Sequence, residues 1–201
     1  MGAAFPDIPA GFVALGGAWV AGNGHGLWGD GRTPSFSEPP ANLPNVRELV
    51  AVPPSRHGRF DAFTKIGFAV LALALRQAGF APDGRLRRVG LVMASRRGCL
   101  DTDLEFQRGC VPDASLASPN LFSYTLPGVV LGECAVAFGL TGPTLSVGGD
   151  GPEAVKVACL LLRDDALEAC VAGWLEASHG AVALVLDKFP GNCVAKAPER
   201  G

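Results

Sequence analysis

The pair Asp150 and Glu153, in the segment GGDGPE, has residue types and spacing suited to acid–base chemistry beside the start of a helix. A water molecule activated by Asp150, or by His179 in the segment EASHG, would be able to act in hydrolysis. The same D-x-x-E spacing is also that of a capping box, in which both carboxylates accept hydrogen bonds from free N–H groups of the first helical turn. We favour the capping interpretation.

The other residues capable of chemistry show no supporting motif. His25, His57 and His179 lie in polar or glycine-rich segments, and the GNGHG segment lacks the glycine spacing of a nucleotide-binding loop. Six cysteines are spread along the chain without a C-x-x-C pair or a histidine at ligand spacing. Cys159 shares a helical stripe with apolar residues, which favours packing over nucleophilic chemistry. The sequence therefore predicts no cofactor, no metal site and no disulfide framework.

The composition excludes several classes of protein. The chain has 201 residues, of which 48% are hydrophobic, and its 17 basic and 19 acidic residues give a net charge of −2. A nucleic-acid-binding protein normally has a basic excess. The longest apolar run, from Ile66 to Leu75, is about half the ~20 residues that a membrane-spanning helix needs. The N-terminal segment has no basic residues and contains two prolines, unlike a signal peptide, so we expect a cytoplasmic protein.

Hydrophobic patterning predicts alternating strands and helices. The expected strands are residues 11–20, 88–95, 144–147, 169–175 and 181–186, and the expected helices are 59–79, 126–138 and 152–163. Residues 22–40 are expected to form a long loop, because they are rich in Gly, Pro and Ser. The last two strands are too close for a helical crossover and should form a hairpin.

These elements predict an α/β fold, a layered mixed sheet with helices on both faces. We expect residues 1–189 to form one domain and residues 190–201 a flexible tail.

Residues 118–147, SPNLFSYTLPGVVLGECAVAFGLTGPTLSV, resemble the β-ketoacyl synthases of the thiolase superfamily. In that family an S-P-x-x-F segment and an F-G-L-x-G-P-x-x-x-V segment lead into the turn that carries the nucleophile. The segments RFDAFTKIGFAVLALALRQAGF, ACVAGWLEA and GAVALVLDK are similar to the family's early helix and later strand pair. The resemblance implies half of a thiolase-like fold, the N-terminal half.

The chain departs from the family at the nucleophile. Active members place a cysteine at the start of the helix after this motif, and that position is Gly151 here. The family's catalytic histidines and lysine belong to a second half with no match in this chain. The resemblance therefore implies a non-catalytic protein, a partner or scaffold in fatty-acid, polyketide or aryl-polyene synthesis, analogous to chain-length factors. An acyl-thioester enzyme with different chemistry and a degenerate remnant without activity are the alternatives.

The resemblance also implies where partners would bind. Family members pair through the strand before the nucleophile turn, which corresponds to Thr144, Leu145, Ser146 and Val147. We expect a homodimer or a heterodimer with a full-length ketosynthase. Arg85, Arg87 and Arg88, with Arg96 and Arg97, bracket one strand and would suit an acidic acyl carrier protein as a basic patch. A solvated strand end explains these arginines better, and we favour it.

Overall fold

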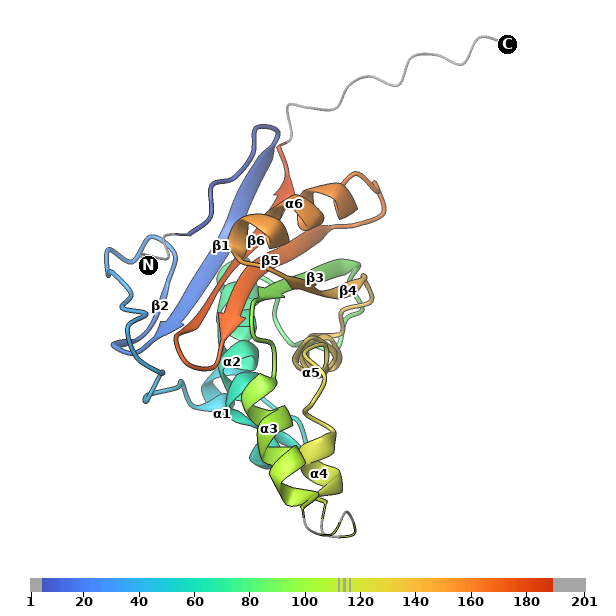
Figure 1. Ribbon diagram of the computed structural model, residues 1–201. Helices are drawn as coiled ribbons and strands as arrows, with labels where there is room; N and C mark the ends of the chain where they lie inside the picture. The colour runs from blue at the N-terminus through green and yellow to red at the C-terminus, as the bar shows by residue number, and fades with distance from the viewer. Residues whose placement is uncertain (1–4, 112, 114, 116, 190–201) are drawn as a thin grey trace.

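A computed structural model describes residues 5–111, 113, 115 and 117–189. Its centre is a six-stranded mixed sheet with the strand order β2-β1-β6-β5-β3-β4 (Figure 1). Strand β3 is parallel to both of its neighbours, and the remaining pairs are antiparallel. The strands are β1 (Phe12–Ala21), β2 (Gly24–Leu27), β3 (Val89–Ser95), β4 (Thr144–Gly148), β5 (Ala169–Glu176) and β6 (Gly180–Lys188).

Helices lie on both faces of this sheet, as predicted. Helices α2 and α5 share one core with the sheet, and α6 packs against the opposite face (Figure 1). Helices α3 and α4 extend beyond the sheet. The helices are α1 (Val46–Leu49), the 3₁₀ helix η1 (His57–Arg59), α2 (Ala62–Gln77), α3 (Leu100–Gly109), α4 (Pro119–Phe122), α5 (Val129–Phe138) and α6 (Gly151–Leu161).

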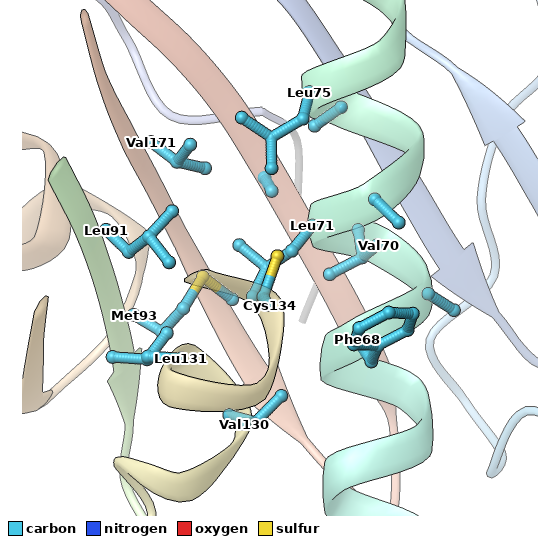
Figure 2. Close-up of a cluster of buried hydrophobic side chains, with 14 of the residues drawn as sticks. Phe68, Val70, Leu71, Leu75, Leu91, Met93, Val130, Leu131, Cys134 and Val171 are labelled. Atoms are coloured by element: carbon cyan, nitrogen blue, oxygen red, sulfur yellow. The ribbon is translucent and has the colours of Figure 1, made fainter. Parts of the chain in front are cut away.

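Helix α2 is the long buried helix that the sequence predicts. Its N-cap is Asp61, whose Oδ1 accepts a hydrogen bond from the Thr64 N–H at 2.8 Å. Gly79 has φ +85° just after the helix, a conformation that favours glycine. Phe68, Leu71 and Leu75 are almost completely buried, and α2 packs beside α5 over the sheet (Figure 2).

Two features of the predicted sheet are confirmed. All seven residues of β3 are buried, as expected for a parallel strand with both faces covered. Strands β5 and β6 form the predicted hairpin, with Glu176 paired with Gly180 across a short connection. Gly180 has φ +121°, and a Cβ there would lie 2.1 Å from the Val20 carbonyl oxygen. A side chain at this position would therefore disrupt both the turn and the neighbouring strand.

The predicted loop of residues 22–40 is wrong in part, because it contains β2. Gly22 and Asn23 connect β1 to β2, and Gly24 takes the positive φ of +121°. The Asn23 side chain donates to the Thr33 carbonyl oxygen at 2.9 Å and accepts from the Ser35 N–H at 2.8 Å. These bonds tie the segment back onto the hairpin.

The short helices α1, α3, α4 and η1 are also absent from the sequence prediction. In the described part of the chain no helix is long and apolar enough to cross a membrane. The predicted tail, residues 190–201, lies outside the described residues.

Candidate functional site

Gly151, which the resemblance places at the family's nucleophile position, lies at the carboxyl edge of the sheet. Strand β4 ends at Gly148, a turn through Gly149 follows, and Gly151 is the first residue of α6. Gly149 has φ +125°, which favours glycine at this turn. The ends of the parallel strands β3 and β5 meet at the same edge, the usual location of sites in parallel sheets.

Asp150 and Glu153 form a capping box at the start of α6, the interpretation favoured from the sequence. The Asp150 N–H donates to Glu153 Oε2 at 3.3 Å. Asp150 Oδ2 also accepts a hydrogen bond from Arg96 Nη2 at 2.6 Å. The hydrogen bond with Glu153, followed by the bond to Arg96, lowers the pKa of Asp150. Asp150 is therefore ionised, but its lowered pKa makes it a weak base, and its carboxylate already accepts hydrogen bonds. Both features disfavour a role as general base.

Glu176, at the end of β5, joins this cluster. Its Oε1 accepts from the Arg96 N–H at 2.6 Å and from the Ser95 hydroxyl at 3.2 Å, while Oε2 is buried without a partner in the structure. The Ser95 Oγ in turn accepts from the Gly98 N–H at 2.7 Å. Sequence reasoning placed Arg96 in a solvated strand end and did not single out Glu176. The signal available was their position after neighbouring strands, β3 and β5, which are parallel and end at the same edge.

Side chains of this chain cover Gly151, which is buried. A Cβ at this position would lie 3.3 Å from Trp174 Cδ1 and 3.4 Å from Pro6 Cγ. Trp174 in turn contacts Phe36 edge to face at 5.0 Å between ring centroids. The helix start that would hold the nucleophile is therefore packed with aromatic and proline carbon atoms.

A pocket of about 240 Å³ lies nearby, lined by residues at the starts of α2 and α3 and at the β5–β6 turn. Gly151 is not among the residues that line it. The lining includes the thiol of Cys99, whose pKa rises to about 12, mainly because of burial. The Cys99 thiol is therefore a poor nucleophile, and the hydroxyl-bearing residues Thr102 and Ser178 also line the pocket.

His179 and His57 lie in different surroundings, and neither contacts Asp150 in the described residues. His179 is exposed, and its Nδ1 lies 2.7 Å from Ser178 Oγ. Asp150 bonds instead to Arg96 and Glu153, so the described residues do not show an Asp150–His179 dyad. His57 packs against Phe60 and Phe68, with ring centroids 5.2 Å and 6.3 Å away. Burial, and to a lesser degree Lys65, lowers the pKa of His57.

The cysteines behave as small core residues. Cys99, Cys134, Cys159 and Cys170 are buried free thiols, and Cys110 is half-buried. Burial raises the pKa of Cys134 and Cys159, and raises that of Cys170 to about 12. Cys193 lies outside the described residues. Within the described ranges, no group of three His, Cys, Asp or Glu side chains is arranged to hold a metal ion.

The arginines of the predicted basic patch lie before β3, at the opposite end of that strand from Gly151. Arg87 binds Asp83 at 2.8 Å through both of its terminal nitrogens. Arg85 and Arg88 have weaker ion pairs, at 3.8 Å with Asp83 and 3.7 Å with Asp164. The positive charge is therefore partly neutralised, most completely at Arg87.

Strand β4 forms one edge of the sheet. Thr144, Leu145 and Ser146 are exposed, and Leu145 keeps 38% of its surface accessible. The strand contains no charged residue and no proline, the usual features that protect an edge from pairing. This edge is therefore available for another strand.

Residues 46–186 match the family model for the β-ketoacyl synthase N-terminal domain. A Streptomyces virginiae protein named as a polyketide β-ketoacyl synthase is 31% identical over 110 residues, which are 50% of this chain and 26% of that protein. The chain belongs to the β-ketoacyl synthase family, through its N-terminal domain.

Solved structures show the same fold. The ishigamide ketosynthase/chain length factor matches with a TM-score of 0.66 and 13% identity, over 90% of this chain and 59% of that chain. A type II polyketide ketosynthase, in complex with its acyl carrier protein, matches with a TM-score of 0.65 and 14% identity, over 88% and 63%. This chain thus spans less than two thirds of each of these proteins. The predicted relationship to ketosynthases and the thiolase-like fold are confirmed.

Proposed function

We propose that this protein is a non-condensing member of the ketosynthase family. It would act as a partner or scaffold in polyketide, fatty-acid or aryl-polyene synthesis. One observation carries the proposal: Gly151 occupies the nucleophile position and is buried under Trp174 and Pro6. A condensing enzyme needs a thiolate there and space for an acyl chain beside it. This position offers neither.

The proposal extends to the partner. The structural neighbours include a ketosynthase with a chain length factor and a ketosynthase with its acyl carrier protein. By analogy, the open strand β4 would pair with a second copy or with a ketosynthase, through Thr144 to Val147. Arg85 and Arg88 would meet an acidic carrier protein, because their side chains are 81% and 57% exposed. We place residues 1–189 in one folding unit, since β1 and β6 lie side by side in the sheet.

A hydrolysis assay on thioesters distinguishes this proposal from the alternative, an acyl-thioester enzyme with different chemistry. The purified chain should release no acid from acyl-carrier or acyl-CoA thioesters above the rate without protein. Asp150→Asn and His179→Ala should leave that background rate unchanged, because the proposal assigns the chain no hydrolytic chemistry. His179→Ala is the stricter test, since its Nδ1 lies 2.7 Å from Ser178 Oγ. Catalysed release that either substitution removes would show that the chain is a thioesterase and would overturn the proposal.

A further inference from the structure

Residues 5–8 form a strap without regular secondary structure on the α6 side of the sheet. Pro6 is buried, and its Cγ lies 3.4 Å from the position that a Cβ at Gly151 would take. Phe5 and Ile8 are half-buried and pack against the core that α6 shares with the sheet. The strap therefore covers the start of α6 with a buried proline that has an apolar side chain on each side.

Apolar contacts hold the strap in place. Phe5 lies beside Trp28, with ring centroids 6.5 Å apart, and also packs against the small cluster around Trp19. Among the described residues, no hydrogen bond or ion pair joins residues 5–8 to the rest of the chain. Segments held in this way open locally at a lower free energy than the hydrogen-bonded core of a protein.

The turn between the strap and β1 can act as a hinge. The Phe12 N–H donates to the Pro9 carbonyl oxygen at 3.2 Å, and Gly11 has φ +89°. Pro9 and Ala10 are exposed, so nothing packs over the turn. From Phe12 onward, β1 is hydrogen-bonded to β6. Movement of the strap therefore ends at the turn and leaves the sheet intact.

The strap lies outside the part of the chain that the family model matches. That match covers residues 46–186, which include Gly151 and Trp174. Residues 5–8 precede it, and so does Phe36, whose ring packs edge to face on Trp174. The cover over the start of α6 is therefore contributed by residues that the family model does not describe.

We infer that residues 5–8 are a displaceable strap that closes the start of α6. The strap opens about the turn at residues 9–11 while the sheet and its helices stay folded. Opening exposes Gly151 and the ring of Trp174, and closing removes them from solvent. The opening equilibrium of the strap therefore sets the access of other molecules to this helix start. This inference goes beyond the proposed function and does not depend on it.

Thiol alkylation tests the strap, with Gly151→Cys as the reporter. Cys134 is the internal standard for global unfolding, because it is buried in the core on the other face of the sheet. Adding Phe5→Ala and Ile8→Ala should raise the iodoacetamide alkylation rate of the introduced thiol at least about tenfold, because both truncations remove apolar contacts of the closed strap. The Cys134 rate should not change. Asp7→Ala, at an exposed strap position, is the matched control and should change neither rate.

The urea dependence of alkylation gives a second measurement, which needs only the Gly151→Cys variant. Strap opening exposes little surface, so the alkylation rate of the introduced thiol should rise less steeply with urea than that of Cys134. Peptide mass spectrometry follows both thiols in one sample. This comparison decides the question if the variant with both truncations unfolds.

Two results would overturn the inference. An introduced thiol that stays as slow after Phe5→Ala and Ile8→Ala would show that the strap does not control access to residue 151. The same urea dependence for the two thiols would show that this position opens only when the whole chain unfolds. Neither result concerns thioester hydrolysis, so the strap and the proposed lack of condensing activity can fail separately.

Discussion

Replacing Gly151 with cysteine is expected to give a protein that forms no ketoacyl product and whose new thiol reacts slowly. The backbone at this position permits a side chain, since its φ is not positive. The added Cβ, however, would already lie 3.3 Å from Trp174 Cδ1 and 3.4 Å from Pro6 Cγ, so the sulfur enters a closely packed position. We expect the free energy of unfolding to fall by about 1–3 kcal/mol, the usual cost of overpacking.

Two control variants make this result interpretable. Gly151→Ala adds only the Cβ and should cost less stability than Gly151→Cys. Gly58→Cys introduces a thiol at an exposed position with nothing within 4 Å of its Cβ, so it should be alkylated by iodoacetamide at the rate of a free thiol. Mass spectrometry and denaturant unfolding give both measurements. Equal alkylation rates for Gly151→Cys and Gly58→Cys would mean that the nucleophile position is open.

Replacing Leu145 with aspartate is expected to break the proposed assembly through β4 and leave single chains. The carboxylate would lie at the proposed seam between β4 and its partner strand, unpaired and desolvated, which costs several kcal/mol. We expect the dissociation constant to rise more than about 100-fold, because each 1.4 kcal/mol is a factor of about ten. The monomer should remain folded, since Leu145 is 38% exposed in the single chain.

Val52→Asp is the matched control, because Val52 is 84% exposed and lies far along the chain from the sheet edge. Analytical ultracentrifugation should find Val52→Asp dimeric and Leu145→Asp monomeric. A dimer that survives Leu145→Asp would place the subunit contact elsewhere and would show that β4 is not the pairing strand.

The sequence predicted the parts of the fold that depend on hydrophobic periodicity. The stripe in residues 59–79 gave α2, and the uninterrupted apolar run before Ser95 gave the buried strand β3. Strand β2 could not be predicted in this way, because its four residues contain two glycines and depend on side-chain bonds from Asn23. Helix α3 has a single buried residue, Thr102, and therefore no apolar stripe that identifies it.

The candidate site was predictable only in part. The family motif located Gly151, and D-x-x-E spacing located the cap. Pro6 lies more than 140 positions before Gly151, and Trp174 lies 23 positions after it. No local sequence pattern therefore encodes their packing over Gly151. The Arg96–Asp150 ion pair depends likewise on the parallel arrangement of β3 and β4.

Incubation of the unmodified protein with acyl-carrier and acyl-CoA thioesters, followed by intact-mass analysis, tests the central claim most directly. A condensing member of the family would retain the acyl group as a thioester on its cysteine. Here the nucleophile position has no side chain, and the buried thiols have raised pKa values. We predict that the mass stays that of the free chain. A stoichiometric acyl adduct on any buried cysteine would contradict the account.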